Sequence, residues 1–485
     1  MTLKKNKIVY KNFSQNFNFD DSEYLTSTNC SLKYNVQSSK GYLTEGKGLK
    51  KLCLPFFYPT VPTEVETSSQ NFNFVRIWYY SYYSETDKKQ KYFMIAFGND
   101  NYLYYSNLHT HAGKFYKIPN CSALSSVPDT INFMLGTDSV IGFASTTDNL
   151  LVWYCDKDPY LAKNTPRFKS ICLHGDRLFA IDADEDNVVR YSATYNPLDW
   201  KKDISSSEDA DKITLNDYKS NLQKLVSFND FVYVFHDYGI SKITSYNLTK
   251  KFYCTNIYNT TSKIYTNTVC VCGEYIYFLQ EDGLYRLDKT DIKRIDFKFS
   301  DLFMPNQDEA NSCYFDGKYY LACKLDFNDG EESTYNNSLV EFDFENNEFN
   351  IIKGIDIVSM LPINISGVNK IVIARRDKNI LYELTSTSQI DSLATFKFWQ
   401  SGQITFGTID DKKIIKDLHI YSKYDCDFTI TSNKKTFKFS IKGQDKIQRV
   451  PINLVGNEFK FSLSSTADKM LIKYLEINYV TKSYD

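Results

Sequence analysis

The segment Phe231-Val232-Tyr233-Val234-Phe235 is followed by the turn Asp237-Tyr238-Gly239 and by a second apolar segment that begins at Ile240, and this pattern decides the fold. Apolar runs of this length between turn residues are typical of buried β-strands. The same order of strand, turn and strand occurs in six other places. The first strands there are Phe93–Phe97, Val140–Phe143, Arg177–Ile181, Tyr275–Leu279, Lys318–Ala322 and Lys370–Ala374. The seven second strands begin at Tyr102, Leu150, Val188, Ile240, Leu284, Leu339 and Ile380.

The spacing of the repeat indicates an architecture. Tyr102 and Ile380 are six intervals apart, so one repeat is about 46 residues long, close to a four-stranded propeller blade. A blade cannot bury its own faces and needs a neighbour on each side. We therefore predict an all-β protein with a seven-bladed β-propeller. Six or eight blades also fit, because the start of the chain can complete a blade.

The segments on either side of the repeats predict two further parts. Residues 1–70 alternate aromatic and polar residues, as in Asn12–Phe19, which is typical of an extended N-terminal arm with short strands able to add to a sheet edge. Residues 71–395 hold the repeats and form the propeller. Residues 396–485 contain evenly spaced alternating segments and predict a C-terminal β-sandwich. Its expected strands are 412–422, 427–432, 436–441, 450–455, 459–463 and 471–480.

Composition and charge exclude several classes of function. The 38 Tyr and 35 Phe favour β-structure. A formal net charge of −2, from 57 basic and 59 acidic residues, gives no reason to expect sequence-specific nucleic-acid binding. No secretory signal is visible and no apolar run is long enough for a membrane helix, so we expect no membrane contact. The 11 scattered cysteines fit free thiols in a protein made in a reducing cytoplasm.

The sequence gives only weak evidence for a metal-binding or catalytic site. His109 and His111 flank one threonine but have no third ligand at a recognisable spacing. The acidic segment Asp182–Asn187 could bind calcium but lacks the spacing of the helix-loop-helix motif, so a solvated hairpin turn is the simpler interpretation. The first strands of the repeats are expected to be the inner strands that face the channel, and they carry no pair of carboxylates. The sequence therefore predicts no enzymatic activity and no cofactor or metal.

One blade carries a more specific pattern. Phe168–Phe179 is followed by Val189–Ala193 and by Asn196-Pro197-Leu198-Asp199-Trp200. Gly41–Leu49 precedes the repeats, and Phe398–Gly407 leads into the C-terminal strands. In this order, the segments resemble those of bacteriophage tail and head-completion propellers, including the tail-stabilisation (tail accessory) proteins of short-tailed phages. The chain departs from that pattern at Asn196, where the family often has Asp, and at Glu45, where it has a basic residue.

The resemblance implies a structural role in a virus particle. It implies a virion tail protein, made in the host cytoplasm, that forms a ring with copies of itself. That ring would join portal or connector proteins to distal tail components. Within the matching segments, Arg177 can reach a carboxylate or carbonyl, Pro197 fixes a turn and Trp200 is a large packing anchor. With Tyr191 and Trp399, these residues are candidates for stabilising a blade or for contacting a neighbouring subunit.

Two alternatives come from other classes of protein. A carbohydrate-binding receptor-recognition protein would expose aromatic residues together, and Tyr79, Tyr80, Tyr82 and Tyr83 are a candidate group. A propeller glycoside hydrolase would need two carboxylates about 5–10 Å apart at the mouth of the channel.

Overall fold

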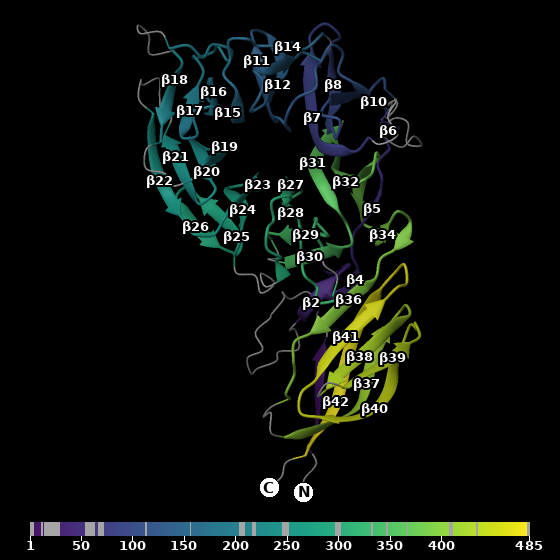
Figure 1. Cartoon of the computed structure of the whole chain (residues 1–485). Helices are drawn as coiled ribbons and strands as arrows, with labels where there is room; N and C mark the ends of the chain where they lie inside the picture. The colour runs from purple at the N-terminus through teal and green to yellow at the C-terminus, as the bar shows by residue number, and fades with distance from the viewer. Residues whose placement is uncertain are drawn as a thin grey trace.

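A computed structural model gives the architecture of the chain (Figure 1). It describes residues 4–10, 13, 30–53, 64–65, 72–111, 114–155, 157–202, 209–215, 220–244, 252–295, 302–330, 333–345, 348–365, 367–406, 411–432 and 435–482. Apart from Phe13, the aromatic stretch 12–19 lies outside these residues. The described part of the chain is all β, as predicted, with no α-helix and hence no helix suited to crossing a membrane.

Seven sheets, here called blades 1 to 7, follow one another around a ring in the described part of the chain (Figure 1). Blade 1 contains β6 (Glu64–Val65), β7 (Phe74–Ser84), β8 (Lys89–Gly98), β9 (Leu103–Asn107) and β10 (Lys114–Lys117). Blade 2 contains β11 (Asp129–Leu135), β12 (Asp138–Ala144), β13 (Leu151–Trp153) and β14 (Tyr160–Leu161). Blade 3 contains β15 (Phe168–His174), β16 (Arg177–Asp182), β17 (Val188–Tyr191) and β18 (Asp211–Thr214). Blade 4 contains β19 (Leu222–Phe228), β20 (Phe231–His236), β21 (Gly239–Thr244) and β22 (Tyr253–Asn259).

The remaining blades complete the ring. Blade 5 contains β23 (Ile264–Cys272), β24 (Tyr275–Gln280), β25 (Gly283–Asp288) and β26 (Asp291–Arg294). Blade 6 contains β27 (Asn311–Phe315), β28 (Lys318–Cys323), β29 (Ser338–Asp343) and β30 (Glu348–Lys353). Blade 7 contains β31 (Ile357–Ile365), β32 (Val368–Arg375), β33 (Leu381–Thr385), β5 (Gly48–Lys51), β34 (Gln389–Ile390) and β35 (Leu393–Ala394).

The expected position of the repeated apolar strands was wrong. Strands such as β20 are the second strand of their blade, and the strand before each of them, such as β19, borders the channel. A second strand is covered by strands on both edges and by blades on both faces, so all but the first residue of β20 is buried. The inner strand borders the open channel, so β19 contains four half-buried residues, two after each of its first two buried residues. A continuous apolar run indicates a strand that is buried on both faces. In this propeller the most buried strand of a blade is the second one and not the innermost one.

The N-terminal arm closes the propeller. Strand β5 pairs antiparallel with β33, from Gly48 opposite Thr385 to Lys51 opposite Tyr382. The first residues of the chain thus supply a strand to the last blade. Blade 7 then packs against blade 1, where the Ile77 amide donates to Ser359 Oγ at 3.2 Å.

The sandwich is built from both ends of the chain (Figure 1). One sheet has the order β3 (Val36–Ser39), β4 (Tyr42–Glu45), β42 (Leu471–Lys482), β37 (Lys412–Ser422) and β40 (Ile447–Gly456), and β1 (Lys4–Tyr10) also pairs with β42. The other has the order β2 (Cys30–Tyr34), β36 (Lys397–Ser401), β41 (Lys460–Ser465), β38 (Cys426–Ser432) and β39 (Lys435–Ile441). Glu45 joins the two ends, since its Oε2 accepts from the Met470 amide at 3.0 Å.

A buried ion pair fastens the sandwich to the propeller. Lys33 on β2 is fully buried, and its Nζ lies 2.9 Å from Glu348 Oε1 on β30 of blade 6. Beside it, the Asn35 amide donates to the Ile351 carbonyl at 2.8 Å. Because a buried charge is stable only when paired, this contact fixes where the two parts meet. All 11 cysteines are free.

Candidate binding site in the propeller channel

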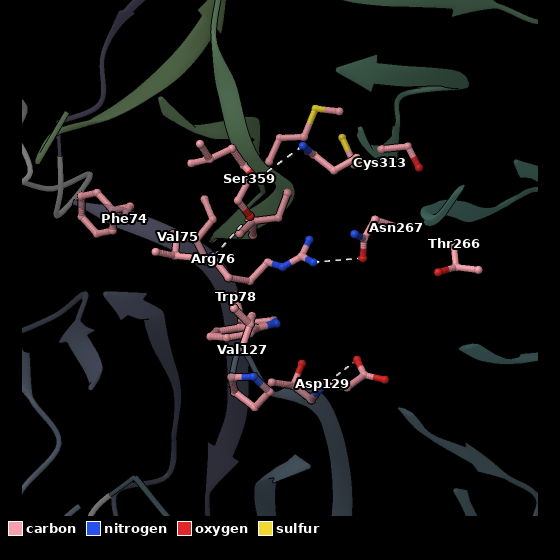
Figure 2. A pocket seen from close by; sticks show the side chains of 18 of the residues that line it. Phe74, Val75, Arg76, Trp78, Val127, Asp129, Thr266, Asn267, Cys313 and Ser359 are labelled. Atoms are coloured by element: carbon pink, nitrogen blue, oxygen red, sulfur yellow. Dashed lines mark hydrogen bonds between the residues drawn. The ribbon is translucent and has the colours of Figure 1, made fainter. Parts of the chain in front are cut away.

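The channel through the propeller contains a cavity of about 1410 Å³ (Figure 2). Inner strands of all seven blades contribute to its wall, from β7, β11, β15, β19, β23, β27 and β31. The side chains in the wall include both charged and apolar groups. A large cavity with both charged and apolar groups in its wall is a natural place to look for a ligand, so the channel is the candidate binding site.

A β-bulge recurs near the start of four inner strands. One residue in each is left without a partner on the neighbouring strand, and the paired residue after it lines the channel. Bulges bend a strand and re-aim its side chains. The channel-lining residues placed in this way are Arg76 on β7, Ser170 on β15, Lys224 on β19 and Ser359 on β31.

Arg76 reaches across the channel. Its Nη2 donates to Asn267 Oδ1 at 3.2 Å, as Figure 2 shows, and Asn267 lies on β23 of blade 5. Blades 1 and 5 are not neighbours in the ring, so this hydrogen bond crosses the lumen. A path for a nucleic-acid duplex through the propeller itself is therefore closed at this level.

Hydrogen bonds between neighbouring inner strands form a belt around the channel. Asp129 at the start of β11 is its most connected member, since Oδ2 accepts from the Ser170 hydroxyl at 2.7 Å and from the Ile171 amide at 3.1 Å. Ser170 Oγ in turn accepts from the Leu225 amide at 3.2 Å. These bonds satisfy backbone donors exposed at the bulges and hold the wall in one geometry.

Two half-buried cations, Arg76 and Lys224, dominate the electrostatics of the channel. Burial lowers the pKa of the Arg76 guanidinium, and the nearby Asp129 charge opposes that shift. Burial also lowers the pKa of Lys224, where the Asp129 charge opposes the shift and the Arg76 charge adds to it. Both directions fit two positive charges that share the channel and are shielded from part of the solvent.

Three of the four carboxylates that line the channel have partners. Glu309 pairs with Arg376 at 2.5 Å, Asp308 pairs with Lys263 at 2.6 Å, and Asp129 is held in the belt. The fourth, Asp377, is exposed at the edge of the cavity. Glycoside hydrolysis needs two carboxylates that act as acid and base, and three of the four here are already engaged.

The residues selected from the sequence lie in blade 3, away from the channel. Arg177 Nη1 donates to the carbonyls of Ser192 at 2.6 Å and Asp209 at 2.9 Å, and its guanidinium lies 5.3 Å from the Tyr191 ring centre. Tyr191 is buried. The carbonyl partners were among those expected for Arg177, and they tie the loop after β17 to β16.

Pro197 and Trp200 lie in that loop. The turn around Pro197 is closed by the Ala193 amide, which donates to the Asp199 carbonyl at 2.9 Å. Trp200 is buried, and its ring centre lies 4.5 Å from that of Phe168. Trp200 therefore packs the loop onto its own blade in this chain.

Trp399 belongs to the sandwich. It is buried on β36, and the rings of Tyr10 and Phe13 each lie 5.5 Å from it in edge-to-face orientation. It holds the start of the chain against the C-terminal strands, so it is not brought together with the four blade 3 residues.

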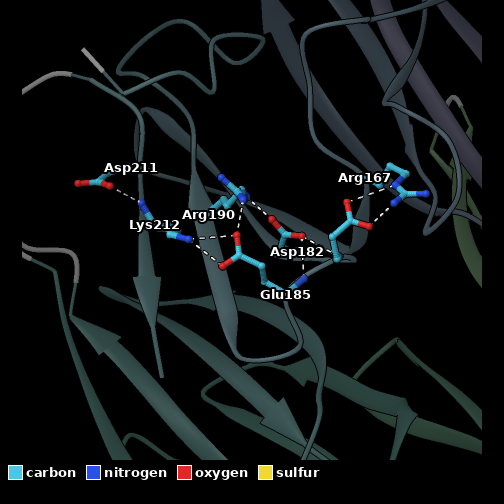
Figure 3. Close-up of polar contacts among 7 residues, drawn as sticks. Arg167, Asp182, Glu185, Arg190, Asp211 and Lys212 are labelled. Atoms are coloured by element: carbon cyan, nitrogen blue, oxygen red, sulfur yellow. Dashed lines mark hydrogen bonds and ion pairs between the residues drawn. The ribbon is translucent and has the colours of Figure 1, made fainter. Parts of the chain in front are cut away.

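The acidic segment after β16 is a hairpin turn full of ion pairs (Figure 3). Asp182 Oδ1 accepts from the Asp184 amide at 2.7 Å, and Oδ2 pairs with Arg190. Glu185 lies 2.7 Å from Lys212 and 2.8 Å from Arg190. These carboxylates form ion pairs with basic side chains. Among the described residues, no group of three or more potential metal ligands occurs.

The tyrosines of β7 do not form one exposed platform. Tyr80 is buried, Tyr79 donates to the Asn364 carbonyl at 2.7 Å, and Tyr82 stacks on Phe93. Only Tyr83 of this group is exposed, at 52%. Successive side chains of a strand point to opposite faces, so Tyr80 and Tyr82, whose ring centres lie 5.6 Å apart, are separated from Tyr79 and Tyr83.

The histidines also have structural contacts. His109 lies 3.2 Å from the Gln90 carbonyl, and His111 Nδ1 accepts from the Asn107 amide at 3.0 Å. His109 thus contacts β8 while His111 contacts Asn107 at the start of their own loop, so the two imidazoles serve separate structural contacts.

Comparisons with known proteins identify no family. No protein-family model matches the sequence, and no curated protein matches it. Solved structures that match part of the chain at low identity include a virginiamycin B lyase from Staphylococcus aureus, with 12% identity over 70% of this chain and 98% of that chain at a TM-score of 0.43. A computationally designed protein matches with 9% identity over 67% of this chain and 100% of that chain, at a TM-score of 0.39. Chaetomium thermophilum Raptor matches with 10% identity over 71% of this chain and 29% of that chain, at a TM-score of 0.43.

Sequence reasoning missed Arg76, Lys224 and Asn267. The signal that was available is a basic residue two positions after the first residue of a strand, at Arg76 in β7 and again at Lys224 in β19. The link from Arg76 to Asn267 spans 191 positions and has no local pattern.

Proposed function

We propose that this chain is a structural protein of a bacteriophage tail, without enzymatic activity, that forms a ring with copies of itself. The ring would join portal or connector proteins to distal tail components. The resemblance of the blade 3 and terminal segments to phage propellers supports the assignment to a tail. The observation that supports assembly is the open end of the sandwich.

The two ends of the sandwich differ. At one end, the edge strands β2 and β3 lie against β30 of the propeller, through the Asn35 and Lys33 contacts. At the other end, β39 and β40 are the last strands of their sheets and have no further strand beside them among the described residues. Figure 1 places this open end on the side away from β2 and β3.

The open edge favours addition of a strand along β39. Unpaired edge strands attract further strands, and proteins protect them with proline and bulges. Strand β40 has such protection, since Pro451 lacks an amide hydrogen and Asn453 adopts a positive φ of 58° beside a register shift. Strand β39 has neither, and Phe437 on it is 41% exposed.

A neighbouring copy is the occupant that we favour. An edge that receives an element from a different part of the next copy makes a head-to-tail contact, and such contacts close into rings when the rotation between copies allows it. The segment from the partner would supply backbone hydrogen bonds to β39 and cover Phe437.

The test measures mass and symmetry. Light scattering on the purified chain and electron microscopy of particles that carry it should show a ring on a tail axis, or a monomer that forms a ring beside its connector partner. Phe437→Lys should reduce ring formation, whereas Tyr253→Lys, at a 66% exposed site on β22, should not. A monomer with no place in any particle, or equal assembly of both variants, would contradict the proposal.

A further inference from the structure

Two channel cations lack an anionic partner. Neither Arg76 nor Lys224 has a carboxylate oxygen within 4.0 Å in the described part of the chain. Arg76 uses one of its five N–H groups for Asn267, and the Lys224 ammonium has no hydrogen bond to a described residue. Mutual repulsion and poor solvation make this arrangement unfavourable without a further negative charge.

The groups around the two cations balance only part of that charge. Asp129 on β11 supplies one negative charge that acts on both cations, and its Oδ2 accepts two hydrogen bonds from β15. Lys169 on β15 also lines the cavity and adds positive charge, while Asp377 is exposed at its edge.

The other charged lining groups are paired within the wall. Arg376 is neutralised by Glu309 and Asp356, and Asp308 by Lys263. On β23, the Cys270 thiol has a lowered pKa, first through its hydrogen bond with Cys272 and further through the Lys224 charge. The nearest ionisable neighbour of Lys224 on that strand is thus a thiol and not a carboxylate.

We propose that the channel binds a small oxyanion with two negative charges, of the phosphate type, between Arg76 and Lys224. The guanidinium presents several donors in a fixed plane, which suits the tetrahedral or planar oxygens of such an anion. Lys224 supplies the second charge, and the Asn267 amide group, which orients Arg76, can donate through its nitrogen. The cavity of about 1410 Å³ leaves ample room for the anion and its water.

This site is independent of ring assembly. The channel lies at the centre of the propeller, whereas the open sandwich edge lies beyond blade 6, so either proposal can fail alone.

The experiment uses the full chain and inorganic phosphate. Calorimetric titration and thermal unfolding are compared in sodium phosphate and in sodium chloride at equal ionic strength. We expect saturable phosphate binding and a higher Tm in phosphate. K224Q should weaken binding at least tenfold, K224R should retain it, and Lys201→Gln, which removes an exposed charge outside the channel, should leave it unchanged.

Further variants and a second anion sharpen the result. R76Q should weaken binding as K224Q does, and if R76Q fails to fold the two Lys224 variants still decide. The same titration with malonate in place of phosphate tests whether the site takes a dicarboxylate as well as a phosphate, because both carry two negative charges on oxygen atoms. Phosphate that raises the Tm no more than chloride, or K224Q that binds phosphate as tightly as the unaltered chain, would overturn the proposal.

Discussion

Closure of the propeller by β5 leads to a prediction for Leu49→Ala. Leu49 is buried between two strands, opposite Leu384 on β33 and Ile390 on β34. The strand cannot move to fill a cavity there, because a Cβ at the adjacent Gly48 would already lie 2.2 Å from the Gln389 carbonyl oxygen. Leucine-to-alanine changes in cores that cannot relax cost about 3–4 kcal/mol.

Hydrogen exchange is the suitable assay, because local opening of one blade need not unfold the whole chain. A loss of about 3 kcal/mol raises the opening constant roughly 150-fold, since each 1.4 kcal/mol is tenfold. We expect faster exchange of the β33 amides in Leu49→Ala. The matched control is Leu393→Ala on β35 of the same sheet, where the side chain is 73% exposed and little should change. Equal exchange of β33 in the two variants would refute the idea that β5 holds blade 7 closed.

Three further predictions concern packing, charge and pH. Trp200→Ala should lower the stability of blade 3 by about 3 kcal/mol, measured by urea unfolding, because its ring fills the space beside Phe168. Lys33→Ala should cost about 3–5 kcal/mol by leaving Glu348 buried and unpaired, and a double change to Lys33→Met with Glu348→Leu should recover most of that loss in a thermal melt. Burial lowers the pKa of His236 to about 4 from 6.5, so the unfolded chain binds the proton more tightly. Stability should thus be unaffected above pH 7 and fall by up to about 3 kcal/mol from pH 6.5 to 4, a loss that His236→Gln should remove in a pH series of melts.

The parts of the fold that could be predicted are those in which burial leaves a pattern. The segment 231–235 became β20 because a strand covered on both faces must be apolar throughout. The predicted segment 412–422 coincides with β37, where one face is buried and the residues alternate. The ability of the arm to add to a sheet edge was also visible, but not which sheets it would join, because register depends on partners more than 300 positions away.

The residues that line the channel could not be predicted from the sequence. They are polar because they face the lumen, and the periodicity of a strand does not distinguish a lumen from the outer surface. Arg76 and Lys224 face an open lumen, so they read as ordinary half-exposed strand residues in the sequence. The bulges that aim them inward depend on pairing with the next strand. In contrast, Arg177 and Trp200 were found from a motif, and the structure places both in contacts within blade 3.

Pairing of the first strands with the last has a consequence for synthesis. Strand β2 leaves the ribosome long before its partner β36, which begins at Lys397. At typical synthesis rates the delay is about 20–70 s. During that time β1, β2 and β5 have no partners, β3 and β4 can pair only with each other, and the propeller ring is still growing behind them. The nascent chain therefore has to stay soluble, with its first strands not yet paired to their late partners, until translation is nearly finished. Slow codons near the end of the message, or a chaperone that acts late in translation, should affect the yield of folded protein more than the same factors acting early.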